Sequence, residues 1–577
     1  MAREVITLQI GHFANSIGTH MWNVQESSFC YGATGAAGVK EIDSDVLYRE
    51  GRTLLGDVTY TPRLIAVDLK GSLNTLRPDG VLYDVETEAN DITWGGDVTM
   101  HKASPPVKNQ FLTDLDLSDE NALQKSQNTS TDTPDKDMEE LSSSSSQTAP
   151  PIKDKIYHLD ESVSVWSDYL YGHLHPKSLA IVRDFTHQSE TEKFELYPQG
   201  KDLLKKRELS EELEDKLHFF AEECDHLQGF HILANFDDGF SGMAAGIVEL
   251  LNDEYHGKGV LTWGVVPAVS SSNSATQDTY RVINSAIAFE QLSQYSSYFV
   301  PVALNSSLWR KYGPALSSPY LLYDPTLNYH TSAILASCIE SMTLPFRLTK
   351  EAISISQLCE MLSAGGKKIG TLCSSLPFPL LERQSIVSRL NEIQDTSIFK
   401  PLAPDVGNFS CLSPYSQFVV CRGFPNNKLK DAVPQPQNPF EVGKSVDEMM
   451  KMMISNLYPS TVSSLLTVSQ AALTSSPYPH IFSPLVSSSG LIGDKPRPED
   501  EAVKSIPLVT SLQSSPATRN LLSKLSSEAK KIDLRRYHGY FESNMEADEY
   551  QEILDNLDSL NQRYDGGSSP MEDSDDD

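Results

Sequence analysis

Cys224-Asp225-His226-Leu227-Gln228-Gly229-Phe230 opens the stretch that decides the fold, and Asp237-Asp238-Gly239-Phe240-Ser241-Gly242-Met243 closes it. Between them, residues 230–235 form an apolar run typical of a buried strand. A helical pattern over 243–255 and a second apolar run over 260–266 follow the glycine-containing loop. A strand, a loop, a helix and another strand of these lengths predict an α/β domain with a parallel sheet.

The same alternation extends outward from this stretch. Apolar runs predict strands at 5–10, 64–69 and 178–184, and helices are expected to begin near Asn15 and at Ser210. Parallel sheets bind ligands beyond the carboxyl ends of their strands. We therefore expect a functional site in the loops after residues 10, 69, 184, 235 and 266.

Two of these loops resemble sequence signatures of the tubulins. The loop Gly11-His12-Phe13-Ala14-Asn15-Ser16-Ile17-Gly18 resembles GQCGNQIG, the first nucleotide loop, and an aromatic residue follows it. The stretch from Cys224 resembles CDxLQGF leading into GGGTGSGM. The resemblance covers about 1–102 and 157–380, with further similar segments in tubulin order: Tyr60-x-Pro62-Arg63, Val67-Asp68-Leu69, Val265-Val266-Pro267 and Leu376-Pro377-Phe378-Pro379.

Within this superfamily, EVITLQIGHFANSIGTHMWN (4–23) and DVLYREGRTLLGDVTYTPRLIAVDLKGSLNTLR (45–77) are most similar to the Misato family. The resemblance implies a tubulin/FtsZ-like fold: a Rossmann-like N-terminal domain with a parallel sheet, a central helix, a smaller α+β second domain and C-terminal helices. It also implies a role in mitochondrial distribution, morphology and organisation, with ties to microtubules and to the chaperonin that folds tubulin.

Composition sets the expected domain boundaries. Five consecutive serines (142–146) and paired prolines at both ends predict that the polar insertion 103–155 is disordered, because it has little apolar surface to bury. The acidic tail is expected to be disordered as well. The full division is a nucleotide-domain fold at 1–102 and 156–330, the insertion, the central helix and second domain at 331–480, a linker-rich segment at 481–518, C-terminal helices at 519–564 and the tail at 565–577.

Three departures from the tubulin pattern predict that no GTP is hydrolysed. Asp237 and Asp238 stand where the first glycines of the phosphate loop are expected, and carboxylates repel a triphosphate. Lys70 replaces the glutamate that helps to hold magnesium in tubulins. The stretch before Leu376 lacks an Asn-x-Asp motif to position water, and we expect Glu360 to lie on the solvated face of a helix.

The resemblance still marks the remnants of a nucleotide pocket. The segment from Tyr323 to Asn328 resembles a tubulin helix start, although an asparagine at such a position is also an ordinary N-cap. We expect no catalytic residue, no metal site and no obligatory cofactor, with bound GTP as the alternative. The pocket candidates are Gly11, Asn15, Gly18, Lys70, Gly239, Ser241, Gly242 and Asn328.

Charge and cysteine usage restrict the location and the partners. The net charge of −31 argues against a nucleic-acid partner, because such proteins gather positive charge against phosphates. The seven cysteines form no CxxC pair and fit reduced thiols in the cytosol. No apolar run approaches the roughly 18 residues of a membrane span, and the N-terminus resembles neither a secretory signal nor a mitochondrial presequence.

These observations favour a non-catalytic, tubulin-like cytoplasmic protein that associates peripherally with the mitochondrial outer membrane through outer-surface proteins. Two other interpretations remain open at the level of sequence. One is a GTP-binding switch with an altered loop, in which Asn15, Lys70 and Asn328 would hold the nucleotide. The other is a factor that binds tubulin or the cytosolic chaperonin and so affects microtubules.

Overall fold

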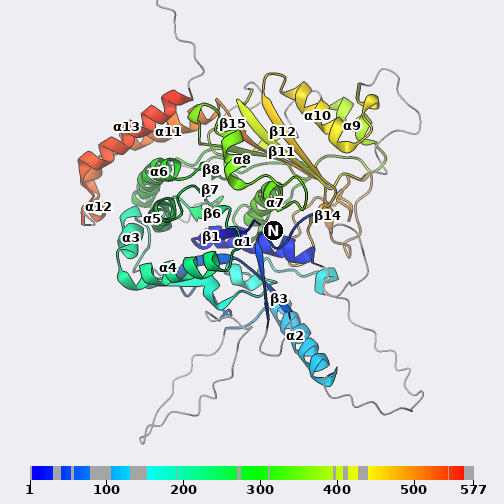
Figure 1. Cartoon of the computed structure of the whole chain (residues 1–577), viewed down its shortest axis with the longest axis horizontal. Coiled ribbons are helices and arrows are strands. Elements are labelled where there is room, and N and C mark those ends of the chain that lie inside the picture. Colours follow the sequence, from blue (N-terminus) through cyan, green and yellow to red (C-terminus); the bar gives the residue numbers. More distant parts are fainter. Residues whose placement is uncertain are drawn as a thin grey trace, which may run out of the picture.

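A six-stranded parallel sheet forms the centre of the first domain (Figure 1). The computed structural model describes residues 3–29, 41–52, 58–77, 106–129, 152–189, 191–269, 274–309, 312–393, 398–406, 413–425, 439–542 and 545–564. The strand order is β5-β4-β1-β6-β7-β8, with all neighbours parallel. The strands are β1 (Val5–Ile10), β4 (Leu64–Lys70), β5 (Leu179–Thr186), β6 (Gly229–Asn235), β7 (Gly259–Val265) and β8 (Tyr298–Val302). The predicted α/β class and the predicted strands are confirmed.

Helices cover both faces of this sheet, which explains why its central strands are apolar throughout. On one face lie α1 (His12–Ser27) and α7 (Asn328–Arg347), which share a core with Val5 and Trp263. On the other face lie α3 (Tyr197–Leu204), α4 (Arg207–Glu222), α5 (Gly239–Glu254) and α6 (Ala275–Tyr295), which share a second core with Ile6 and Phe230.

The central helix α7 joins the first domain to a second sheet. Its side chains are buried from Tyr329 to Arg347. Inside the junction, Glu340 of α7 accepts a hydrogen bond of 2.8 Å from Arg347 and a second one from Arg422 of the second sheet. All three side chains are at least 96% buried, with exposures of 2% to 4%. A buried ion triad therefore ties the two domains together.

The second sheet has five strands in the order β10-β9-β15-β11-β12. They are β9 (Thr371–Ser375), β10 (Lys400–Pro401), β11 (Ser416–Arg422), β12 (Val462–Val468) and β15 (Leu508–Ser514), accompanied by α8 (Ile355–Leu362), α9 (Ile386–Glu392) and α10 (Val446–Leu457). The remaining strands of the described residues form two antiparallel pairs: β2 (Tyr48–Arg52) with β3 (Val58–Pro62), and β13 (Ala472–Leu473) with β14 (Ser505–Ile506). The mixture of strands and helices is the expected α+β second domain.

The C-terminal helices return to the first domain, where Figure 1 shows them in orange and red beside α6. They are α11 (Thr518–Lys530), α12 (His538–Glu542) and α13 (Ala547–Arg563). The Tyr540 hydroxyl donates a 2.7 Å hydrogen bond to Asn284 of α6, and the Tyr564 hydroxyl donates one of 3.1 Å to the Ile369 carbonyl. These contacts hold the end of the chain against both domains.

Two of the expected boundaries are wrong. The insertion 103–155 contains helix α2 (Gln110–Thr129), and Phe111 on it is completely buried against Tyr157. The apolar pair at the start of α2 supplies the burial that the average composition of the segment conceals. The linker-rich segment 481–518 contains β15, the middle strand of the second sheet. The serine run 142–146 and the tail 565–577 lie outside the described residues.

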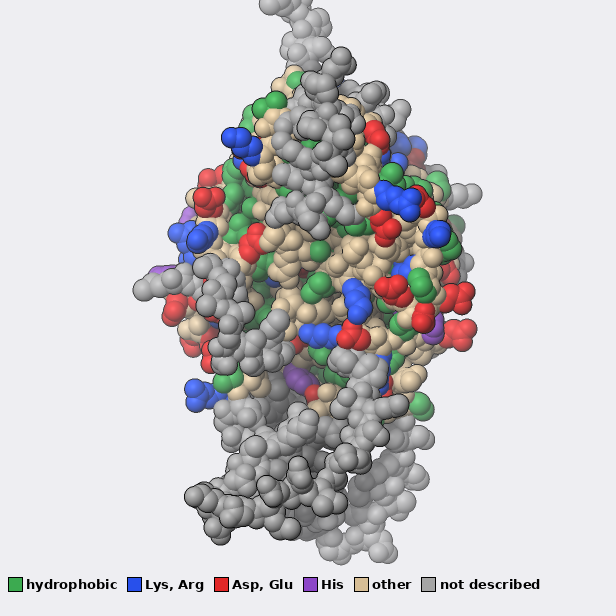
Figure 2. All heavy atoms as spheres, turned by 90° about the vertical axis from the view of Figure 1, so that its right-hand side faces the viewer, with side chains coloured by type: hydrophobic (Ala, Val, Ile, Leu, Met, Phe, Trp, Pro, Cys, Tyr) green, Lys and Arg blue, Asp and Glu red, His purple; other side chains and the backbone are tan. Residues whose placement is uncertain are grey.

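The surface in Figure 2 mixes charges of both signs. Basic and acidic side chains lie next to one another there, with hydrophobic side chains scattered between them. Within the described ranges, no helix has the length and hydropathy needed to cross a membrane.

Replacing Phe111 by alanine should destabilise the protein by roughly 3 kcal/mol, because it empties a fully buried aromatic site. Leu117→Ala is the matched control, since Leu117 lies on the same helix with 52% of its surface exposed. Denaturant unfolding of both variants measures the difference. Equal stability of the two variants would restore the view that the insertion contributes nothing to the fold.

Candidate functional site

The loops after β1, β4, β5 and β6 meet at the carboxyl edge of the first sheet, as the sequence predicts. They bring together His12 at the start of α1, Asp68 on β4, His187 after β5 and Asn235 at the end of β6. The N-termini of α1 and α5 also point to this edge. Helix N-termini offer backbone amides and a partial positive charge, so this place can hold an anion.

Side chains of the protein accept a hydrogen bond from one backbone amide at each of these two helix ends. The Asn235 side chain accepts a 3.0 Å hydrogen bond from the Ala14 amide of α1 and donates a 2.9 Å bond to Asp238. The other oxygen of Asp238 accepts a 2.9 Å bond from the Phe240 amide of α5. Ser241, a pocket candidate, is fully buried and donates a 2.5 Å bond to the Asp238 carbonyl. An internal amide and carboxylate thus cap both helices.

Two candidate glycines fit against these internal groups. Gly11 has φ 107°, and a Cβ on it would lie 2.7 Å from the Asn235 side chain. A Cβ on Gly239 would lie 2.8 Å from the Phe194 ring, which packs edge-on against Phe240. Both glycines therefore allow close approach of the chain's own side chains.

The other two candidate glycines serve helix packing. A Cβ on Gly242 would lie 1.9 Å from the Tyr197 carbonyl, because α3 crosses α5 at this point. A Cβ on Gly18 would lie 1.8 Å from the Gln9 side chain of β1. Gly242 lets two helices pack almost backbone to backbone, and Gly18 leaves space for the Gln9 side chain against α1.

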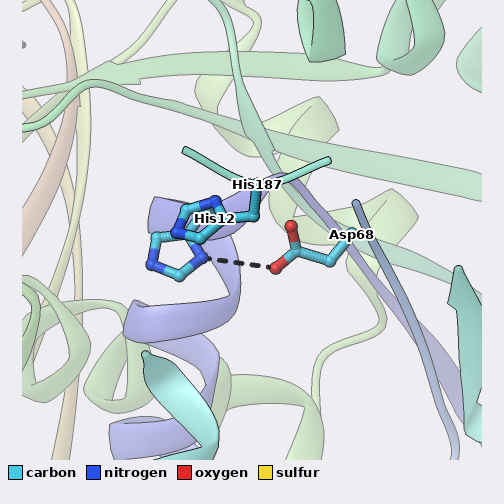
Figure 3. Close-up of side chains that lie close together, drawn as sticks. All are labelled: His12, Asp68 and His187. Carbon is cyan, nitrogen blue, oxygen red and sulfur yellow. Dashed lines mark ion pairs between the residues drawn. The ribbon is translucent and has the colours of Figure 1, made fainter. Parts of the chain in front are cut away.

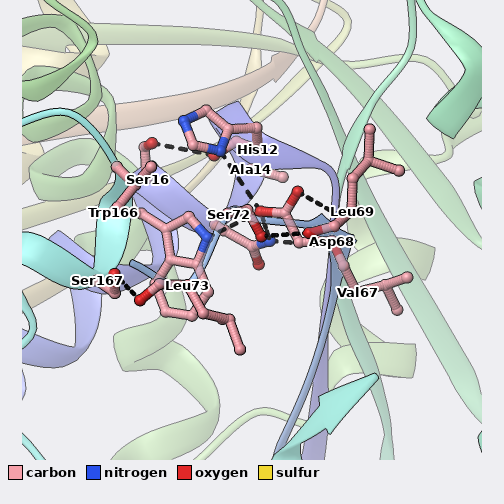
Figure 4. A network of polar contacts seen from close by, with 12 residues as sticks. His12, Ala14, Ser16, Val67, Asp68, Leu69, Ser72, Leu73, Trp166 and Ser167 are labelled. Atoms are coloured by element: carbon pink, nitrogen blue, oxygen red, sulfur yellow. Dashed lines mark hydrogen bonds and ion pairs between the residues drawn. The ribbon is translucent and has the colours of Figure 1, made fainter. Parts of the chain in front are cut away.

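Asp68 is the centre of a buried polar network (Figure 4). Its carboxylate accepts hydrogen bonds from Asn15 at 3.0 Å, from the Trp166 indole at 2.8 Å and from the Leu69 amide at 2.8 Å. Burial raises the pKa of Asp68, but His12, the Leu69 amide and Asn15 together lower it by more, so that it lies below its usual value. The pocket candidate Asn15 is therefore engaged as a structural partner, with a second bond to the Val67 carbonyl.

The remaining candidates lie outside this network. Lys70 is exposed at the end of β4, and its carbonyl accepts a 2.8 Å bond from the His187 amide. Asn328 is exposed at the first position of α7. Its neighbour Tyr329 packs against His20 with ring centroids 5.4 Å apart. Glu360 is exposed on α8, as expected.

Negative charge is unfavourable on both aspartates of the glycine-poor loop. Burial and then the neighbouring Asp237 raise the pKa of Asp238 to about 8. Burial also raises the pKa of Asp237, which the charge of Arg281, 3.7 Å away, partly opposes. Phosphate groups placed here would add negative charge beside two acidic side chains whose ionisation is already unfavourable.

Sequence reasoning missed a compact group of metal-ligating residues at the same edge (Figure 3). His12, Asp68 and His187 each offer one ligand atom, and these atoms lie within 4.8 Å of one another. The two imidazole rings stack with centroids 4.1 Å apart, and burial lowers the pKa of His187 to about 4. The available signal was positional: each residue lies in or beside a loop that follows a strand of the parallel sheet.

Comparison with known proteins agrees with this geometry. A family model described as the Misato Segment II tubulin-like domain matches residues 3–117, and a model described as the Tubulin domain matches residues 157–348. Protein misato homolog 1 of Danio rerio is 38% identical over 596 residues, covering 100% of this chain and 99% of the relative. The chain belongs to the Misato family.

Other Misato proteins match over nearly their whole length. Protein misato homolog 1 of Homo sapiens is 38% identical over 572 residues, covering 98% of this chain and 99% of the relative. Protein misato of Drosophila melanogaster is 29% identical over 576 residues, covering 96% and 97%. The chain is thus a Misato-type, tubulin-like protein with a tubulin/FtsZ-like fold.

Replacing Asp238 by asparagine should stabilise the protein increasingly as the pH rises. A carboxyl whose pKa is raised on folding binds its proton more tightly in the folded state, so the wild type loses stability between the unfolded value of 3.8 and about 8. The variant lacks this loss. Its stability relative to wild type should therefore grow by at least about 1 kcal/mol between about pH 5 and pH 8.

Urea unfolding at both pH values measures this change, and any pH-independent cost of the altered hydrogen bond to Asn235 cancels in the comparison. Asp225→Asn is the control, because Asp225 is exposed in the loop before β6. A difference between Asp238→Asn and wild type that stays constant with pH would contradict a raised pKa of Asp238 in the folded protein.

Proposed function

We propose that this Misato protein is a non-catalytic, tubulin-like protein that acts in mitochondrial distribution, morphology and organisation, and that it has exchanged the nucleotide of the fold for internal contacts. One observation carries the proposal: the bridge from the Ala14 amide through Asn235 and Asp238 to the Phe240 amide. These are the amides at the two helix ends where an anion would bind.

The surroundings of the bridge support the same conclusion. A phosphate at this place would have to displace the half-buried Asp238 side chain and approach the buried Asp237. The Phe194 ring covers Gly239 at the start of α5. Lys70, the replacement for a magnesium-holding acid, is exposed and cannot ligate a cation. Loss of a water-positioning group alone costs about 10²–10⁴-fold in rate.

The mitochondrial role rests on membership of the Misato family and on the resemblance described above. We place the protein in the cytoplasm, bound peripherally to outer-surface proteins of mitochondria. The mixed surface charge and the lack of a spanning helix in the described ranges are compatible with attachment through protein partners. Loss of the protein should then alter the mitochondrial network without a loss of GTP turnover.

Purified wild-type protein should contain no guanine nucleotide and show no magnesium-dependent GTP hydrolysis. Asp238→Gly should gain measurable nucleotide binding, because it frees the Phe240 amide and removes an acidic side chain from the place where the phosphate would lie. Chromatography after denaturation measures the nucleotide content, and calorimetry measures the gained binding. Asp225→Gly removes an exposed acid instead and should bind no better than wild type. Stoichiometric guanine nucleotide in the wild type, lost on Asn15→Ala, would refute the proposal.

Peripheral attachment gives a separate expectation in cells. Washing isolated mitochondria with alkaline carbonate should release the protein, because its contacts would be with partner proteins and not with the bilayer interior. Immunoblots of pellet and supernatant measure the release, with an integral outer-membrane protein as the control. Retention in the pellet together with protection from added protease would contradict attachment at the outer surface.

A further inference from the structure

We propose that His12, Asp68 and His187 form a binding site for a divalent transition-metal ion, with zinc as the preferred ion. Asp68 lies on β4, and His12 and His187 lie just beyond the ends of its two neighbours in the sheet, β1 and β5; the ligand atoms lie within 4.8 Å of one another. The proposal concerns the metal alone, so it holds whether or not the N-termini of α1 and α5 can bind a nucleotide.

Two buried nitrogen atoms without a hydrogen bond point to a missing ligand at this place. Nδ1 of His12 and Nε2 of His187 are both buried, and neither forms a hydrogen bond within the described part of the chain. The nearest acceptor of His12 is the Asp68 carboxylate, at 3.5 Å. Leaving a buried polar atom unsatisfied costs about 1–3 kcal/mol, so two of them beside one carboxylate need an explanation.

The donor set selects the kind of ion. Two imidazole nitrogens and one carboxylate oxygen are a common zinc ligand set, and a water molecule completes the tetrahedron. Magnesium prefers oxygen ligands in an octahedron, and calcium prefers six to eight oxygens, so a site with two histidines disfavours both. Softer ions such as Cu(I) favour sulfur, and no cysteine belongs to the group.

The backbone and the second layer of contacts already hold the three residues in place. The His187 amide donates a 2.8 Å bond to the Lys70 carbonyl, which fixes the start of the loop after β5. Asn15 and Trp166 donate to the Asp68 carboxylate at 3.0 Å and 2.8 Å. Hydrogen bonds of this kind orient metal ligands and are worth about 10–100-fold in affinity.

Only the imidazoles need to move. Ligand atoms in a tetrahedral zinc site with bonds near 2.0–2.1 Å lie about 3.4 Å apart, so the present spacing must shrink by roughly 1 Å. The His12 side chain is 18% exposed and His187 is half-buried, which leaves room for the rings to turn and for the ion to enter. In Figure 3 both rings lie on the same side of Asp68, so a small rotation brings their nitrogens toward it.

Full-length protein stripped of metal by a chelator and shown to be free of nucleotide should bind one Zn²⁺ per chain. Isothermal calorimetry with ZnCl₂ alone measures affinity, and elemental analysis of dialysed protein measures stoichiometry. His12→Gln and His187→Gln should each weaken binding by about tenfold or more, because each removes one of three protein ligands. His12→Gln introduces the residue of the tubulin pattern at this position, so the fold should tolerate it. His256→Gln, at an exposed histidine after α5, should bind like wild type.

A spectroscopic measurement on unaltered protein keeps the test independent of the stability of the variants. Co²⁺ in the wild type should give the visible absorption of a tetrahedral ion with nitrogen and oxygen ligands, and Zn²⁺ but not excess Mg²⁺ should remove it. Unchanged affinity in both His12→Gln and His187→Gln, an octahedral Co²⁺ spectrum, or displacement by Mg²⁺ would overturn the proposal. Absence of Zn²⁺ binding in the wild type would overturn it as well and would leave a simple His12–Asp68 ion pair.

Discussion

The buried charge of Glu340 is the constraint on which the arrangement of the two domains depends. Burial alone would raise the pKa of this carboxyl, but the charges of Arg422 and Arg347 lower it by more. The group is therefore ionised inside the protein. Removing one partner of such a group typically costs about 3–5 kcal/mol. Helix α7, which carries Glu340, packs along α1, and α1 carries His12 and Asn15. The geometry of the carboxyl edge is therefore linked to a contact made in the second domain.

Much of the first domain could be predicted because its signals are local. Apolar runs bounded by glycine marked five strands of the parallel sheet, and the loops that follow them proved to be where the polar residues gather. The contacts that define the site are not local. Asp68 meets Trp166 across 98 positions, and Asn235 meets Ala14 across 221. No spacing rule predicts such pairs, so the sequence marks Asp238 as unusual in this loop but does not show that it caps α5.

The two misplaced boundaries have a common cause. Composition averages over a segment, whereas burial is decided by a few residues within it. Phe111 and its neighbours find a core between Tyr157 and Tyr171, so a mostly polar segment contributes an ordered helix. In the same way Leu508, Val509 and Leu512 pair between β9 and β11 although prolines and charges precede them. Tertiary contacts outweighed local preference in both places.

The helix N-termini at the carboxyl edge are capped by side chains of the protein itself, so its folding stability does not depend on the nucleotide concentration in the cell. A protein that binds a ligand only in its folded state gains RT ln(1 + [L]/Kd) of stability, so its abundance follows the ligand concentration by mass action. Here the amides of the helix ends donate their hydrogen bonds to Asn235 and Asp238, at fixed stoichiometry and at every GTP concentration. Under the function proposed above, such a protein stays equally folded when the GTP concentration of the cell falls.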